Sequence, residues 1–221
     1  THENARLRTP AGLAIDQRAN GGLYIAEVGN HCIRRVTPNG RTSVAFGFPT
    51  EPGRSLEVRD EEPATSSRLS GPAGVAVRGD DLIVADSAND SLVMFSAGSG
   101  FVRLLGGQPG AAGFVDGTGR EARLDTPTGL AISTDGSLLA VADTGNDAVR
   151  LVALVNVGDG RVRGVVSTLG RASSGKGARP SGGPDGMPIV FDDPKAVTFD
   201  GIGSVCVVDA LGASVVTRPE G

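Results

Sequence analysis

The sequence has little of several features that define large classes of proteins. It has no tryptophan, only 4% aromatic residues, and no run of about 18 apolar residues that could span a membrane. Its two cysteines, Cys32 and Cys206, are too few for a disulfide framework and lie in apolar, strand-like segments, so we expect free structural thiols. These absences predict a soluble, globular chain without a membrane partner and leave its compartment open.

The basic residues do not form a stripe along the sequence. The 21 Lys and Arg residues against 25 Asp and Glu residues give a net charge of -4, and the basic residues occur singly. A nucleic-acid partner is therefore not expected, because phosphate backbones are bound by basic stripes. The only histidines, His2 and His31, cannot form a multi-histidine zinc site, and we expect His31 on a surface turn. We assign no cofactor and no metal ligands.

Glycine and proline are abundant instead, with 34 and 13 residues, and they mark an internal repeat. Each repeat has a proline, a five-residue apolar strand, a Gly- or Asp-containing turn, and a second strand that ends in an acidic residue. A third strand follows in every repeat and a fourth strand in the first three. The repeat prolines are Pro10, Pro72, Pro127 and Pro194.

The repeats, at about 5–47, 67–107, 122–170 and 189–221, predict an all-β fold. The first two strands of each repeat are apolar at nearly every position, so both faces of each small sheet must be covered. The intervening segments lack helical periodicity, which leaves radial stacking of four-stranded antiparallel sheets, a β-propeller. A two-sheet sandwich is the alternative, but it gives no reason for the same proline, hairpin and acidic turn to recur in register.

The segments Pro127–Ile132 and Val141–Arg150 resemble the NHL repeat, with its Pro-x-Gly strand and its Ala-Asp-x-Gly-Asn turn. The connection Gly113–Leu124 is similar to those of NHL propellers found beside thioredoxin-like domains. The family commonly has about six blades. We therefore expect residues 1–221 to form one NHL-type propeller segment, with further blades elsewhere in a parent chain or on a second copy. The fourth repeat has lost the Asn-containing turn, reading Gly212-Ala213 there.

The acidic residues that end the second strands could form a ring of carboxylates for a cation. A carboxylate at a tight turn also accepts N–H bonds from the loop that follows it, which we consider the stronger interpretation because it explains why every repeat has one. The asparagines three residues later are expected to adopt the left-handed backbone of these turns. The acidic residues are Glu27, Asp86, Asp143 and Asp209, and the asparagines are Asn30, Asn89 and Asn146.

Alternate positions of the first two strands are expected to be buried between blades, together with the only tyrosine, Tyr24. On the first strands these residues are Leu13, Ile15, Val75, Val77, Leu130, Ile132, Val197 and Phe199. On the second strands they are Ile25, Val84, Val141 and Val207.

In antiparallel blades, the second-to-third turns and the inter-repeat connections emerge on one rim, here called the loop rim. The first-to-second turns emerge on the opposite rim, called the short-turn rim. Long connections on a rigid scaffold favour recognition, although they are also tolerated as neutral insertions. We therefore expect a non-catalytic protein-interaction scaffold; a calcium-type propeller hydrolase or lyase is the alternative, and a small-ligand sensor is a third possibility. The candidate binding residues are Arg54, Arg59, Glu61, Glu62, Arg120, Glu121, Lys176 and Arg179.

Overall fold

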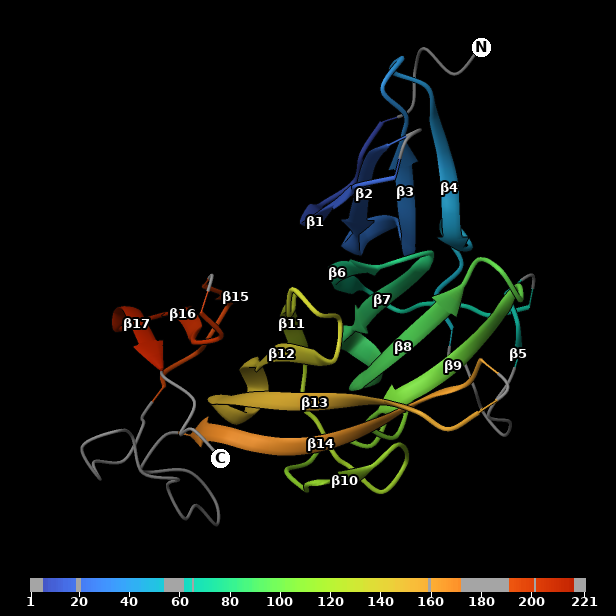
Figure 1. The fold of residues 1–221 in the computed structure, drawn as a ribbon. Helices are drawn as coiled ribbons and strands as arrows, with labels where there is room; N and C mark the ends of the chain where they lie inside the picture. The colour runs from blue at the N-terminus through green and yellow to red at the C-terminus, as the bar shows by residue number, and fades with distance from the viewer. Residues whose placement is uncertain are drawn as a thin grey trace.

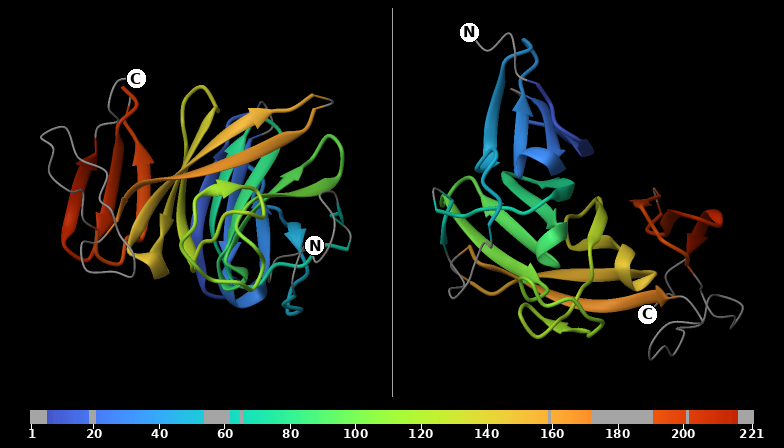
Figure 2. Two further views of the ribbon diagram at one scale, coloured as in Figure 1. Left: turned by 90° about the horizontal axis from the view of Figure 1, so that it is seen from below. Right: turned by 180° about the vertical axis from the view of Figure 1, so that it is seen from behind.

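The computed structural model describes residues 6–18, 21–53, 62–64, 66–158, 160–171, 191–200 and 202–216. They form four small antiparallel sheets, blades 1 to 4, which follow one another along an arc (Figure 1). The views from below and behind show the same succession (Figure 2). Helix in this described part is limited to three-residue 3-10 turns, none of which could cross a membrane. The predicted all-β propeller is confirmed.

Blades 1 and 4 form the two ends of the arc (Figure 1). The strands of blade 1 lie in sequence order, and those of blade 4 do so too, with three strands described. Blade 1 contains β1 (Pro10–Asp16), β2 (Gly22–Glu27), β3 (Cys32–Val36) and β4 (Thr42–Gly47). Blade 4 contains β15 (Ala196–Phe199), β16 (Val205–Asp209) and β17 (Gly212–Val216).

Blades 2 and 3 each have a fifth, outermost strand that comes from the connection preceding the blade. These two-residue strands are too short to leave a pattern in the sequence, and they were not predicted. Blade 2 contains β5 (Glu62–Pro63), β6 (Pro72–Arg78), β7 (Asp81–Asp86), β8 (Ser91–Ser96) and β9 (Phe101–Gly106). Blade 3 contains β10 (Gly117–Thr118), β11 (Pro127–Ile132), β12 (Leu138–Asp143), β13 (Ala148–Asn156) and β14 (Val162–Arg171).

The core consists of three apolar layers, one between each pair of successive blades. In each layer, branched residues of one blade pack on a face of the preceding blade that is rich in alanine. Between blades 2 and 3, for example, Leu139 and Val141 pack with Ala76 and Ala85, and all four are buried. Small residues facing large ones allow the sheets to approach closely. The inner strands of blades 2 and 3 lie between two neighbouring sheets, which explains why both of their faces are apolar.

The innermost strands approach so closely that a glycine is required after each of the first three repeat prolines. A Cβ at Gly129 would lie 2.6 Å from the carbonyl oxygen of Lys195 in blade 4. At Gly12 and Gly74 a Cβ would collide with the backbone of the next blade in the same way. The Pro-x-Gly pattern therefore records backbone contact between consecutive blades, and in blade 4 the same position is Ala196.

The predicted core is confirmed in part. Tyr24 is buried, as are Val75, Val84, Val141, Val197 and Val207, whereas Ile25, Val77, Leu130, Ile132 and Phe199 are half-buried. The prediction is wrong for Leu13 and Ile15, which are 57% and 62% exposed. Both side chains belong to blade 1 at the end of the arc, where no other blade in the described part of the chain covers that face (Figure 1). Cys32 and Cys206 are free, as expected.

The contrast between covered and uncovered faces gives a matched test with one residue type. Leu139→Ala is expected to lower the free energy of unfolding by about 2 to 5 kcal/mol through lost burial and a cavity. Leu13→Ala should change it by less than about 0.5 kcal/mol, because the side chain is mostly exposed. Urea unfolding of both variants measures the difference. Equal losses would mean that the blade 1 face is covered in solution.

Candidate functional site

Every second strand ends in a carboxylate that binds the start of its own blade. Backbone N–H groups two residues before the repeat prolines donate to these carboxylates. The pairs are Arg8 N to Glu27 Oε2 (3.0 Å), Ser70 N to Asp86 Oδ1 (2.6 Å), Asp125 N to Asp143 Oδ1 (2.8 Å) and Asp192 N to Asp209 Oδ2 (3.3 Å). The predicted donors in the loop that follows the carboxylate are found in blade 4, where Leu211 N donates to Asp209 Oδ1 (2.9 Å). The carboxylates of the first three blades are fully buried.

The turn asparagines have a different role from the predicted one. Asn89 Nδ2 donates to Asp86 Oδ2 (2.7 Å) and to Gly53 O (2.8 Å), so it joins the buried carboxylate to the incoming connection. Asn146 makes the same two contacts in blade 3, with Asp143 and Gly113. The prediction that the asparagines are left-handed is wrong, because positive φ falls on the following residue in each turn: His31, Asp90 and Asp147.

These left-handed residues link each blade to the next one. Asp90 Oδ1 accepts a hydrogen bond from Thr126 N (3.1 Å), and Asp147 Oδ1 accepts one from Asp193 N (3.0 Å). His31 takes the same position in blade 1, where Nδ1 accepts from Gly71 N (3.0 Å). His31 is therefore a half-buried turn residue with a structural contact. In blade 4, where the sequence signature is lost, a tight two-residue turn, Ala210-Leu211, replaces this arrangement.

Buried charge differs between the equivalent turns. Arg34 pairs with Glu27, and Arg150 Nη1 lies 2.8 Å from Asp143 Oδ2, with both side chains fully buried. Among the described side chains, no arginine or lysine forms an ion pair with Asp86, because the position of Arg34 and Arg150 is Val93 in blade 2. Burial raises the pKa of Asp86 to about 7, and burial also raises that of Asp143, where Arg150 opposes it.

Arg150 fixes the long connection between blades 2 and 3, a role that the sequence did not reveal. Its Nη2 donates to Val115 O (2.9 Å) and Asp116 Oδ1 (2.7 Å), its Nη1 donates to Arg123 O (3.1 Å), and its guanidinium lies 4.6 Å from the centre of the Phe114 ring. Asp116 also accepts from Thr168 N and Oγ1 of β14. The connection therefore has a defined conformation against blade 3.

Few of the predicted binding residues can be located. Arg54, Arg59, Glu61, Lys176 and Arg179 lie outside the described residues, as does the side chain of Glu62, whose backbone is in β5. Arg120 and Glu121 follow β10 and lie together at the outer edge of blade 3, near the β13–β14 hairpin. The structure thus places this pair beside the sheet edge.

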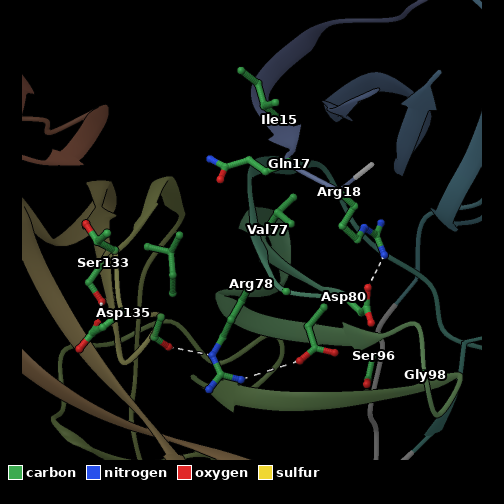
Figure 3. A pocket seen from close by; sticks show the side chains of 15 residues that line it. Ile15, Gln17, Arg18, Val77, Arg78, Asp80, Ser96, Gly98, Ser133 and Asp135 are labelled. Carbon is green, nitrogen blue, oxygen red and sulfur yellow. Dashed lines mark hydrogen bonds and ion pairs between the residues drawn. The ribbon is translucent and has the colours of Figure 1, made fainter. Parts of the chain in front are cut away.

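The short-turn rim, where no site was predicted, carries a cavity of about 960 Å³. Its floor contains Ile15, Val77 and Ile132, the equivalent last apolar residues of three inner strands. The edge of the cavity is polar, and both of its arginines have partners. Arg18 Nη1 donates to Asp80 Oδ1 (2.6 Å), and Arg78 Nε donates to Gly136 O (2.7 Å) (Figure 3). This arrangement offers donors and acceptors around an apolar floor, the composition of a pocket for a polar ligand.

The central space between the inner strands has few polar or charged side chains among the described residues that line it. It is a cavity of about 370 Å³, lined by small or apolar residues of β1, β6, β11 and β15, and Lys195, just before β15, is the one charged residue among the described residues that line it. Across the described ranges, no group of three or more His, Cys, Asp or Glu side chains could hold a metal ion. The acidic turn residues do not form a carboxylate ring, because each binds the backbone that leads into its own blade.

No protein-family model matches the sequence, nor does any curated protein. Solved structures match in fold. An auxiliary nutrient binding protein from Bacteroides ovatus is 15% identical, with a TM-score of 0.64, over 98% of this chain and 50% of its own. A gluconolactonase from Xanthomonas campestris is 18% identical, with a TM-score of 0.56, over 93% of this chain and 57% of its own. A chain of a nidogen/laminin complex is 17% identical, with a TM-score of 0.57, over 95% of this chain and 61% of its own. The chain spans about half the length of the first of these structures, and its fold is that of a β-propeller protein.

The buried carboxylate of blade 2 predicts a pH dependence of stability. Because the folded-state pKa of Asp86 lies above its ordinary value of 3.8, its contribution is greatest below pH 4 and is lost as the pH rises through 7. This loss is expected to reach up to about 4 kcal/mol. Asp86→Asn should flatten that slope in urea unfolding from pH 4 to pH 8, whereas the exposed Asp80→Asn should not. Identical slopes in the two variants would contradict the assignment.

Proposed function

We propose that this chain is a non-catalytic, NHL-like propeller that binds a protein partner through its inter-blade connections. The observation that carries the proposal is the connection between blades 2 and 3, which Arg150 and Asp116 hold in one conformation. A connection that is fixed before binding loses little conformational entropy on association, which favours recognition. Arg120 and Glu121 lie on this fixed segment.

The structural similarities support binding at a coarse level. They include a protein described as nutrient binding and one solved as a protein complex, but also a gluconolactonase. At 15 to 18% identity they establish the fold and leave the activity of this chain to experiment. A metal-dependent hydrolase or lyase therefore remains the second candidate, although the described residues provide no ligand cluster for it.

The uncovered face of blade 1 is part of the same proposal. Leu13, Ile15 and Val44 are each at least 40% exposed, and the equivalent inner-strand positions of blades 2 to 4 pack on a preceding blade. Exposed aliphatic residues gathered on one sheet face favour a docking partner. That partner would be a further blade of a parent chain or of a second copy.

Charge reversal at the outer edge of blade 3 and at the short-turn rim tests where the partner binds. Arg120→Glu with Glu121→Arg should abolish capture of a partner by the full chain, because these side chains steer the encounter. Asp80→Lys with Asp81→Lys, at the short-turn cavity, should leave capture unchanged. Cross-linking followed by mass spectrometry at low and high salt measures both. Equal loss of capture in the two double variants, or loss in the second variant alone, would show that the proposed location of the interface is wrong.

An activity assay separates the two candidate functions. The same purified chain, supplied with calcium or zinc, is expected to show no turnover of gluconolactone or simple esters above the uncatalysed rate. Saturable turnover that is lost on chelation would reject the non-catalytic assignment.

A further inference from the structure

The β13–β14 hairpin departs from the repeat by extending past its own blade. β13 and β14 have 9 and 10 residues, whereas β8 and β9 of blade 2 have 6 each. The pairing of β12 with β13 ends at Leu138 and Ala153, but β13 and β14 remain paired as far as Asn156 and Val162. This outer half of the hairpin extends beyond β12 of blade 3 and crosses toward β9 of blade 2 (Figure 1).

The crossing is tightly packed. Gly106 of β9 faces Val166, whose Cγ2 would lie 2.7 Å from an added Cβ, and a Cβ on Gly164 would collide with the carbonyl of Leu105. The segment after β10 closes the third side, since Gly119 N donates to Gly164 O (3.1 Å). Two outer edges and an inter-blade connection are thereby joined into one rigid surface.

This surface contains a groove of about 460 Å³ in which the fold gathers arginines that are scattered in the sequence. Arg103 comes from β9, Arg120 from the connection, and Arg161 and Arg163 from the hairpin. Among the described side chains that line the groove, Glu121 is the only acidic one. The packing of propeller blades does not require four arginines at one site. Like charges placed together destabilise the folded chain, so their grouping calls for another explanation.

The four arginines differ in exposure: Arg103 is buried (9% exposed), whereas Arg161 and Arg163 are exposed. The side chain of Arg163 is exposed and makes no hydrogen bond or ion pair with the described part of the chain. Arg103, Arg120 and Arg161 do have interactions within the protein. A guanidinium group has five N–H donors, however, so one that has a partner can still donate to an incoming carboxylate.

Exposed valines border the arginines. Val157 lines the groove and is 47% exposed; Val155, 44% exposed, is the cross-strand partner of Arg163, and Val165, 38% exposed, follows on the same face of β14. A ligand for this surface must therefore supply negative charge and apolar contact together. A bare inorganic anion would use only the arginines.

We propose that this groove binds an acidic segment of a protein partner, in which Asp or Glu residues alternate with aliphatic ones. The inference rests on the proposed protein-binding function and specifies its partner. Carboxylates match the planar fork of arginine in bidentate pairs, and the valines accept the intervening side chains. Arg120 then belongs to this groove at the outer edge of blades 2 and 3.

The test uses the purified full chain and a labelled synthetic peptide of alternating Glu and Leu, measured by fluorescence anisotropy. Arg163→Glu is expected to weaken binding by at least about tenfold, because one charge-assisted contact becomes a repulsion. Binding to the unmodified chain should weaken between about 50 and about 300 mM salt. The control, Arg41→Glu, reverses an exposed arginine in the turn before β4 and should bind as tightly as the unmodified chain.

Three results would overturn the inference: no saturable peptide binding, equal loss in the two variants, or a peptide of alternating Glu and Ser that binds as tightly. Competition by inorganic phosphate or duplex DNA at concentrations equal to the peptide would instead indicate a general polyanion site and would also overturn it. If Arg163→Glu still captures the partner in the cross-linking assay, the groove is wrong while protein binding stands. If the unmodified chain captures no partner, the proposed function itself fails.

Discussion

The rest of the structure depends on the buried carboxylate that ends the second strand in each of the first three blades. Glu27, Asp86 and Asp143 each bind the backbone that leads into their own first strand and the asparagine of the following turn. A buried carboxylate is costly unless its oxygens are satisfied, so this network strongly selects one turn conformation. That conformation places the next residue in the left-handed region, from which its side chain reaches the following blade.

The sequence predicted the parts of the fold that repeat. Pro72, Gly74 and Asp86 have equivalents in blades 1 and 3 because these blades need the same turn, the same close approach and a buried acceptor. The prediction failed where one blade differs from the others. Leu13 has the same pattern as Leu130 and was assigned to the core, yet its exposure depends on whether a neighbouring blade exists. A pattern along one strand contains no information on that neighbour.

The functional features could be predicted only in part, because they rest on contacts between distant segments. Arg120 and Glu121 were identified from loop length, but their place beside β14 depends on Arg150 and Asp116. Arg103 and Arg163 are 60 positions apart in sequence and share one groove only because the β13–β14 hairpin crosses blade 2. Segments that differ from the repeat form the surfaces that distinguish one blade from another. Comparing the repeats with each other cannot predict such segments.

The central claim is that polar links, and not apolar layers alone, hold each blade and its connection on the next. Hydrogen–deuterium exchange of Asp90→Ala against the unmodified chain tests it directly. Loss of the Asp90 acceptor should accelerate exchange at Thr126 and along the connection Gly113–Thr126, while β7 and β12 stay protected. Unchanged exchange along that connection would show that apolar packing alone positions the blades, and would contradict the account.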